Sequence, residues 1–252
     1  MATAHFRFYE ELNDFLPPAR RKVEFSVHFS RCPSVKDMIE SLGVPHPEIE
    51  LILVNGQSVD FSYQLRNADR VSVYPVFESL DVTPLIRLRE WPLRNPRFVV
   101  DCNLGRLARY LRLLGFDCIY RNDFQDADVA RIADQQQRIV LTRDRRLLQR
   151  KNITHGLFIR EVIPRRQVPE VLTRMDLRRL VSPFCRCTHC NALLEPVNKT
   201  DIEHHLEPKT RRYFSEFLQC PDCRRIYWKG SHHDRAQRLV EELQSAEWEF
   251  PE

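Results

Sequence analysis

Two short cysteine motifs near the end of the chain constrain its folding more than any other feature. Cys187 and Cys190 form one C-x-x-C knuckle, Cys220 and Cys223 form the other, and 29 residues separate the two. Each knuckle brings two thiolates close enough to share one ion, and two knuckles complete the tetrahedral shell of a structural Zn²⁺. Because four cysteines leave no open coordination position, the chemistry should lie elsewhere. Two disulfides or free core thiols are the alternatives, which the two-residue spacing and the absence of a secretory signal disfavour.

The composition indicates a soluble globular protein. The chain has 252 residues, of which 42% are hydrophobic and 29% are charged, a balance typical of folded domains. No apolar run reaches the ~20 residues of a transmembrane helix, and residues 1–10 lack the apolar core of a signal peptide. Eight cysteines in such a chain indicate a reducing compartment. We therefore expect a cytoplasmic protein with no membrane partner, built from one large domain or two to three small ones.

Positive charge is concentrated in the middle of the chain. Residues 97–182 carry 18 Lys and Arg against 10 Asp and Glu, whereas residues 1–96 and 183–252 each have a net charge of −2. A basic segment of this size suits a polyanion such as RNA. A solvated arginine-rich surface is the alternative.

Residues 1–80 are predicted to form a β-grasp domain. Ser34 is a suitable N-cap for its helix and Gly43 a suitable stop, while Asn55 and Gly56 form a hairpin turn between two strands. The hydrophobic pattern predicts two strands, a helix and two more strands, at residues 5–9, 23–29, 35–42, 51–54 and 70–76.

The same segment resembles ubiquitin-like and sulfur-carrier domains. Their V-N-G and D-R-V-x-V-x-P stretches match Val54–Gly56 and Asp69–Pro75. A sulfur carrier needs a free C-terminal Gly-Gly, whereas Phe-Glu-Ser follows here at residues 77–79 and the chain continues. The resemblance therefore implies a scaffold or an interaction module with a protein partner, without conjugation chemistry.

A proline-rich linker and an α/β segment are expected next. Residues 81–96 contain Pro84, Pro92 and Pro96, which fits an extended linker. Residues 97–182 then alternate strands with helices, which predicts a doubly wound parallel sheet with ligands at the carboxyl ends of its strands. The strands are expected at 98–100, 116–120, 138–141 and 156–160, and the helices at 104–114 and from residue 126.

Carboxylates come directly after two of these strands. Asp101 and Asp144 should lie at the same edge of the sheet, and Asp126 and Asp128 begin the helix that faces this edge. Crowded carboxylates need a cation between them, and oxygen ligands select Mg²⁺ or Mn²⁺. Such a site hydrolyses phosphodiesters because the ion orients water and stabilises both reacting oxygens. The alternative is that these aspartates are ordinary caps or turn residues.

Polar side chains near this edge are candidates for substrate binding. Asn103 and Thr142 are candidates to hold a carboxylate or a metal-bound water, with ordinary turn roles as the alternative. The arginines expected to contact phosphates are Arg106, Arg109, Arg143 and Arg145.

Several stretches carry a resemblance to known nucleases. Asp101-x-Asn103, residues 126–130 and Thr142-Arg143-Asp144 are similar to the acidic signatures of PIN-domain ribonucleases. Residues 104–117, 141–144 and 227–232 (Tyr-Trp-Lys-Gly-Ser-His) resemble, more closely, the Mut-seven C-terminal RNase family. The resemblance implies an α/β multidomain chain, with a ubiquitin-like β-grasp domain, a PIN-like doubly wound core and a zinc ribbon over residues 183–252.

The resemblance also defines the leading hypothesis, a metal-dependent endoribonuclease acting on structured RNA, with tRNA and rRNA as candidate substrates. It implies a catalytic Mg²⁺ or Mn²⁺ bound by Asp101, Asp126 and Asp144, with Asp128 in reserve, beside the structural Zn²⁺. The main alternative is a non-catalytic RNA- or ribosome-binding protein with a degenerate PIN-like site. A protein-interaction adaptor built on the β-grasp domain is the third hypothesis.

One departure from the PIN pattern puts the number of ions in doubt. The usual PIN core has a further acidic residue on a helix between the first and third acidic positions, and the segment here is too short for that helix. Either Asp117 or Asp123 substitutes for it, or the site binds one ion and is slow.

Two features of the last segment have open interpretations. Residues 199–216 mix basic side chains with aromatic ones such as Phe214, which fits RNA contact or a helical insertion packed under the ribbon. His232 and His233, shortly after Trp228, are more typical of a surface or packing pair than of a second metal site.

Overall fold

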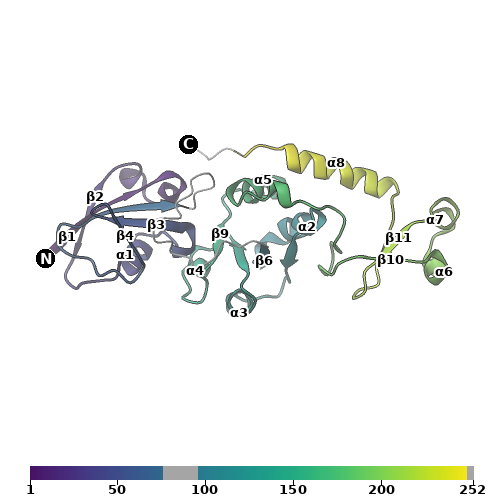
Figure 1. Cartoon of the computed structure of the whole chain (residues 1–252), viewed down its shortest axis with the longest axis horizontal. Coiled ribbons are helices and arrows are strands. Elements are labelled where there is room, and N and C mark those ends of the chain that lie inside the picture. The colour runs from purple at the N-terminus through teal and green to yellow at the C-terminus, as the bar shows by residue number, and fades with distance from the viewer. Residues whose placement is uncertain (76–95, 249–252) are drawn as a thin grey trace. The chain divides into compact units, whose positions relative to one another are not determined.

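The computed structural model describes residues 1–75 and 96–248, which belong to two compact units (Figure 1). In its described part, the first unit holds residues 1–75 and 124–159, and the second holds residues 96–123 and 160–248. The predicted linker, except for Pro96, lies outside the described residues. Within those residues, no helix is both long enough and apolar enough to cross a membrane.

A five-stranded sheet forms the N-terminal part of the first unit, with the order β2-β1-β5-β3-β4. The two central strands β1 and β5 are parallel, and the other neighbours are antiparallel. This topology confirms the predicted β-grasp. Its elements are β1 (Ala2–Phe8), η1 (Glu10–Phe15), η2 (Pro18–Arg20), β2 (Phe25–Phe29), α1 (Val35–Ser41), η3 (His46–Glu48), β3 (Ile49–Val54), β4 (Gln57–Val59) and β5 (Arg70–Pro75).

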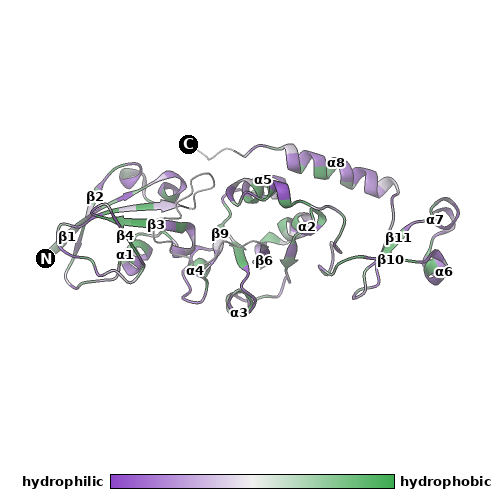
Figure 2. Ribbon diagram, in the orientation of Figure 1, coloured by the Kyte–Doolittle hydropathy of each residue, from purple (hydrophilic) through white to green (hydrophobic). Residues whose placement is uncertain are grey.

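Local sequence explains these elements. The hydroxyl of Ser34 accepts a hydrogen bond from the amide of Asp37 at 3.1 Å and so caps α1. Asn55 and Gly56 have φ angles of 52° and 82°, the left-handed conformation that a tight hairpin between β3 and β4 requires. Hydrophobic residues run along β3 (Figure 2), and the core beneath α1 contains Phe6, Phe8, Ile39, Ile52 and Val73.

A four-stranded sheet with the order β7-β6-β8-β9 forms the central fold. β6 pairs with β7 in parallel within the second unit, and β8 pairs with β9 in parallel within the first. The predicted parallel sheet is therefore confirmed. The elements are β6 (Arg97–Val100), η4 (Cys102–Leu104), α2 (Gly105–Leu113), β7 (Asp117–Ile119), α3 (Asp126–Gln136), β8 (Ile139–Thr142), α4 (Arg145–Leu148) and β9 (Gly156–Phe158).

One helix of the second unit was not predicted from the sequence. α5 (Pro164–Arg174) begins with a proline and contains Pro169. An internal proline removes one backbone hydrogen bond and usually ends a helix. The buried side chains of Val168, Val171 and Leu172 hold α5 in place in spite of this loss.

The last part of the second unit contains an antiparallel sheet of three strands, with the order β10-β11-β12. A helical excursion separates its first two strands, and a C-terminal helix begins at Ser231, after the last strand. The elements after α5 are η5 (Arg178–Leu180), β10 (Glu195–Val197), α6 (Lys199–Ile202), η6 (Glu203–His205), α7 (Pro208–Tyr213), β11 (Phe217–Gln219), β12 (Ile226–Tyr227) and α8 (Ser231–Ser245).

Candidate functional site

The sulfur atoms of the four knuckle cysteines converge on one point. The Sγ atom of Cys187 lies 3.5 Å from that of Cys223, and the Sγ atom of Cys190 lies 3.3 Å from that of Cys220. All four sulfur atoms lie within 4.8 Å of one another. A disulfide needs about 2.05 Å, whereas zinc–sulfur bonds of about 2.3 Å in a tetrahedron place the sulfurs about 3.8 Å apart. The donor set therefore fits a tetrahedral zinc shell.

The two knuckles have the same backbone. In each, the amide of the second cysteine donates to the sulfur of the first, at 3.5 Å and 3.4 Å. The next residue, Asn191 or Arg224, has a left-handed backbone with φ of 83° or 60°. Its amide donates to the carbonyl of the first cysteine, at 3.0 Å in both knuckles. This turn aims amide dipoles at the sulfurs, which stabilises thiolates.

Hydrogen bonds to Cys187 favour its ionised form. Burial raises the pKa of this thiol, but the hydroxyl of Tyr227, 3.1 Å away, and the amides of Cys190 and His189 outweigh burial and lower the pKa to about 6. Burial raises the pKa of Cys190 to about 12, and its sulfur neighbours add to the rise. Because one thiolate opposes ionisation of the next, four thiolates at this spacing need a cation.

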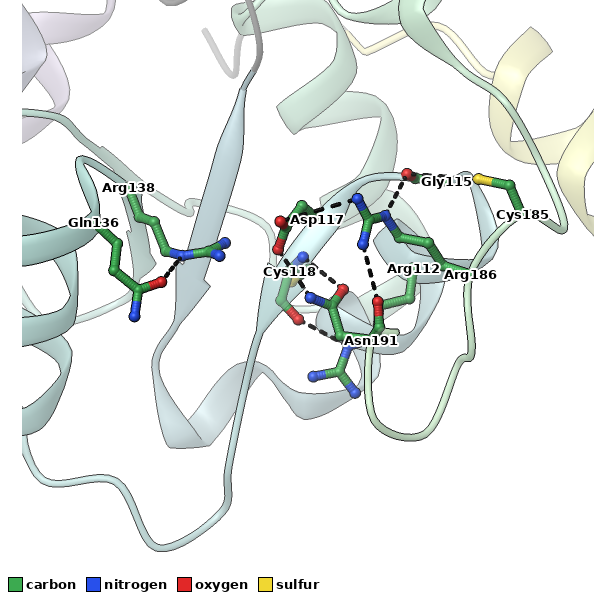
Figure 3. Close-up of polar contacts among 9 residues, drawn as sticks. All are labelled: Arg112, Gly115, Asp117, Cys118, Gln136, Arg138, Cys185, Arg186 and Asn191. Carbon is green, nitrogen blue, oxygen red and sulfur yellow. Dashed lines mark hydrogen bonds and ion pairs between the residues drawn. The ribbon is translucent and has the colours of Figure 1, made fainter. Parts of the chain in front are cut away.

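The first knuckle is bound to the edge strand β7 (Figure 3). The side-chain carbonyl of Asn191 accepts from the amide of Cys118 at 2.8 Å, and its NH₂ donates to Asp117 at 2.8 Å. Arg112 of α2 donates to the carbonyl of Cys118 at 2.8 Å and also to that of His189. Asn191 thus takes the place of a neighbouring strand along β7.

The position and contacts of Asp117 do not fit the role of the missing acidic ligand. In the parallel pairing of β6 and β7, Asp117 lies opposite Arg97, at the amino end of both strands. Asp101 follows the carboxyl end of β6, so the two carboxylates lie at opposite edges of this pair. The carboxylate of Asp117 is bound by Asn191 and lies 3.9 Å from Arg186. Its role is to hold the ribbon.

Three other candidate carboxylates, Asp123, Asp126 and Asp128, lie at or near the start of α3. Asp123 is exposed and pairs with Arg121 at 2.6 Å, which lowers the pKa of Asp123. Asp126 is the first residue of α3 and is exposed. Asp128 accepts from the amide of Gln125 at 3.2 Å in a capping box, so Gln125 is the N-cap. Asp123 stays a candidate for the fourth carboxylate.

Asp144 follows β8 and is the N-cap of α4. Its carboxylate accepts from the amide of Arg146 at 2.7 Å, and its own amide donates to the hydroxyl of buried Thr142 at 2.9 Å. Arg143 donates to the carbonyl of Ile159 at 3.2 Å. These contacts fix the turn after β8. The roles of Asp144, Thr142 and Arg143 in metal and substrate binding stay predictions.

Arg145 contacts the N-terminal domain within the first unit. Its guanidinium lies 5.0 Å from the ring centre of Phe15 and 5.4 Å from that of Phe158, and it donates to the carbonyl of Phe15 at 3.3 Å. Glu48 accepts a hydrogen bond from the amide of Phe158 beside it. The β-grasp domain therefore packs on the segment that follows Asp144. The predicted phosphate contact of Arg145 stays a prediction.

Asp101 is buried, with 5% of its surface exposed, and Asn103 is exposed in the turn that follows. Asp101 belongs to the second unit, whereas Asp126 and Asp144 belong to the first. Over residues 1–75 and 96–248, the four cysteines are the group in which three or more Cys, His, Asp or Glu ligand atoms converge. The acidic metal site therefore stays a prediction.

A buried carboxylate on α5 was not predicted from the sequence. Glu170 is fully buried, and burial raises its pKa. It accepts from the amides of Arg160 and Glu161 at 2.8 Å and 3.0 Å, and it lies 3.6 Å from Arg174. Glu170 thus fixes the turn that follows β9. In the sequence, Glu170 stands alone between apolar residues, which is the pattern of a buried carboxylate. It was not recognised because α5 was not predicted.

A cavity of 1240 Å³ opens in the second unit. Its walls come from α2, from the ribbon strands and from the first turns of α8. It brings together the predicted phosphate-binding residues Arg106 and Arg109 with Phe214, Trp228 and His232. Each of these residues stands out in the sequence, but nothing local in the sequence connects α2 with the ribbon.

Comparisons with known proteins identify two matching family models. Residues 96–240, more than half of the chain, match the Mut7-C RNAse domain, and residues 1–81 match the Mut7-C ubiquitin domain. No curated protein matches the chain.

Two solved structures from Haloferax volcanii are also similar to part of the chain. The structure of small archaeal modifier protein 1 has 15% identity and a TM-score of 0.25, and covers 31% of this chain and 100% of its own. A second structure, of SAMP1, has 14% identity and a TM-score of 0.26, with the same coverage.

Proposed function

We propose that this chain, which belongs to the family of Mut7-C RNAse domains, is a metal-dependent endoribonuclease acting on structured RNA. Its ribonuclease type follows from the family match over residues 96–240, which is the observation that carries the proposal. The metal dependence and the choice of structured RNA, with tRNA and rRNA as candidate substrates, are the proposed part.

Three carboxylates are proposed to hold the catalytic ion. Asp101 follows β6, Asp144 follows β8 and Asp126 begins α3, so each occupies the kind of strand-end or helix-start position at which α/β folds bind ligands. Carboxylate oxygens suit Mg²⁺ or Mn²⁺. Asp128 is the reserve ligand, because its carboxylate already closes the capping box of α3. When bound, such an ion orients the attacking water and offsets charge on the phosphate.

The chain itself supplies positioning at this edge. The hydrogen bonds from Arg146 and to Thr142 hold Asp144 and its turn in a fixed conformation before any ligand arrives. The packing of Arg145 between Phe15 and Phe158 extends this support to the β-grasp domain. Fixed ligand positions reduce the reorganisation needed to bind an ion and a phosphate.

The ribbon is proposed to bind one structural Zn²⁺. Its four thiolates leave no position for substrate, and its contact with β7 through Asn191 stabilises the edge of the nuclease sheet. Free thiols of this kind persist in a reducing compartment, which supports a cytoplasmic location. The domain boundaries at residues 80, 96 and 182 and a protein partner for the β-grasp domain belong to the same proposal.

A cleavage assay on a labelled pool of structured RNA tests the proposal. Zinc-loaded protein should cleave with Mg²⁺ or Mn²⁺ and stop when these ions are left out, without the loss of zinc that a strong chelator causes. Salt-dependent binding without cleavage would instead support the non-catalytic RNA-binding alternative. Absence of both would contradict any role on RNA.

A further inference from the structure

We propose that the 1240 Å³ cavity of the second unit, here called the ribbon cavity, binds a short stretch of single-stranded RNA. Bases stack on Trp228, and Arg106 and Arg109 contact phosphates. The inference rests on the proposed function only in taking RNA as the ligand. Its residues are separate from the acidic ones, so the two proposals can fail independently.

The size of the ribbon cavity indicates an extended ligand. Its 1240 Å³ exceeds the range of about 300–1,000 Å³ that is usual for small-molecule sites. A wall of α2, a wall of ribbon strands and the first turns of α8 enclose it. A site of this kind has room for several nucleotides in a row, in keeping with single-strand binding folds.

Two arginines of α2 line one wall of the ribbon cavity. Arg106 and Arg109 lie three residues apart on α2, so they face the same side of the helix. Both are exposed, and among the described residues neither has a hydrogen-bond or ion-pair partner. Two guanidinium groups held side by side suit consecutive phosphates.

The facing wall adds charge of the same sign through Lys229, which lines it and is exposed. Glu216 is the one acidic side chain among the described lining residues, and it lies 3.8 Å from Lys229. The cavity is therefore basic overall. A polyanion fits this charge, whereas an apolar helix of a protein partner would bury two arginines without counter-charges.

Trp228 supplies the stacking surface. It follows Tyr227, whose hydroxyl contacts the sulfur of Cys187, and Trp228 itself is 36% exposed and lines the cavity. The ring centre of buried Phe217, another lining residue, lies 6.4 Å from that of Trp228. An aromatic ring held at the edge of a basic groove is the arrangement on which proteins stack unpaired bases.

The absence of a side chain at Gly230 leaves room for the indole of Trp228 in this position. A Cβ atom at Gly230 would come within 2.8 Å of the indole Nε1. Any larger residue would therefore displace the ring. This inference assigns roles to the stretch Tyr-Trp-Lys-Gly-Ser-His at residues 227–232. Its tyrosine supports the zinc site, and the residues after it form the RNA-binding wall.

The test uses fluorescence anisotropy with a fluorescein-labelled oligouridylate of about ten nucleotides, within the site sizes of single-strand binding folds. Full-length, zinc-loaded protein without Mg²⁺ or Mn²⁺ should bind this probe better than a duplex of equal length. Trp228→Ala should weaken binding about tenfold or more, because one stacked base is lost. Gly230→Ala should weaken it less, because the ring is displaced and not removed.

The double variant Arg106→Gln/Arg109→Gln addresses the phosphates. Its slope of log affinity against log salt should be smaller by about 1.4, since each phosphate contact on a single strand contributes about 0.7. Trp228→Ala should leave the slope unchanged. The matched controls are Leu180→Ala and Arg179→Gln, two exposed residues outside the cavity lining, which should bind as wild type does.

Three outcomes would overturn the inference. They are wild-type binding by both Trp228→Ala and the double arginine variant, a wild type that does not bind the single strand, and ultraviolet crosslinks to RNA that all fall outside residues 226–233. If the wild type cleaves RNA and the first outcome is found, the RNA-binding role of the ribbon cavity is wrong and the nuclease proposal stands. If binding depends on Trp228 and the arginines but no RNA is cleaved, the nuclease proposal is wrong and the binding role stands. The arginine variant changes exposed side chains only, so it answers the question even where Trp228→Ala unfolds.

Discussion

The cysteine cluster and the acidic strand ends are both predicted metal sites, but the chain builds them in different ways. The four cysteines come from two knuckles within 37 residues, and each knuckle sets its own sulfur geometry through hydrogen bonds inside a few residues. Asp101, Asp126 and Asp144 lie on three separate elements and in two compact units. Each aspartate is positioned by its own turn or cap, so their joint geometry depends on the packing of whole elements.

The comparison shows which kind of site a sequence can specify by spacing. A two-residue spacing closes a turn that aims both sulfurs at one point, whatever surrounds it. An aspartate after a strand specifies only an edge of a sheet.

Cys187→Ser should have the largest effect. Loss of one thiolate removes the zinc and with it the ribbon, because binding free energy of about 10 kcal/mol in small zinc modules is folding free energy. Elemental analysis should give one zinc per wild-type chain and none in the variant, with a lower melting temperature. Cys32→Ser, at an exposed cysteine, is the control and should keep its zinc. A wild type that is as stable without zinc as with it would show that the metal has no structural role.

Asp144→Asn should reduce the rate of RNA cleavage about 100-fold or more, because one charge leaves the proposed cation site. Asp101→Asn should behave alike, and the double variant should be little worse than either, since all act through one ion. Single-turnover cleavage measures these rates. RNA binding should survive or tighten, because a carboxylate that repels phosphate is gone. Asp134→Asn, on the exposed side of α3, is the control; equal rates in all variants would show that the acidic site is misassigned.

Asn191→Ala should lower the free energy of unfolding by about 1–3 kcal/mol, because the amide of Cys118 and the carboxylate of Asp117 lose their partner. The cleavage rate per folded molecule should not change. Urea denaturation and single-turnover cleavage separate the two effects. A large loss of rate at full stability would mean that Asn191 takes part in catalysis.

Asp117→Asn should have the smallest effect, below about 1.5 kcal/mol, since Asn191 keeps a hydrogen-bond acceptor at that position. Cleavage should proceed at the wild-type rate. A rate loss as large as that of Asp144→Asn would return Asp117 to the list of metal ligands and contradict its place at the amino end of β7.

Local patterns in the sequence predicted much of this fold. Asn55-Gly56 specified its hairpin because few other dipeptides adopt two left-handed conformations. Ser34 specified the start of α1 through its side chain. The two knuckles followed from cysteine spacing, whereas the ribbon around them was implied by the family resemblance.

Contacts between segments far apart in the sequence were not predictable in this way. Arg145 was predicted to contact phosphate, and nothing local indicated that it also packs on Phe15, 130 positions earlier. Asparagine is common in turns, and nothing local in the sequence indicates that Asn191 binds β7. α5 was missed because Pro169 argues against a helix, and tertiary packing decides otherwise.

The central proposal is that Asp101 and Asp144 bind the same hard divalent ion. Isothermal titration of zinc-loaded, full-length protein with Mn²⁺ tests it without RNA. Wild type should bind Mn²⁺, and Asp101→Asn and Asp144→Asn should each weaken that binding by about tenfold or more, as loss of a charged oxygen ligand requires. Binding that either variant retains at wild-type strength, or a wild type that binds no Mn²⁺, would contradict the claim.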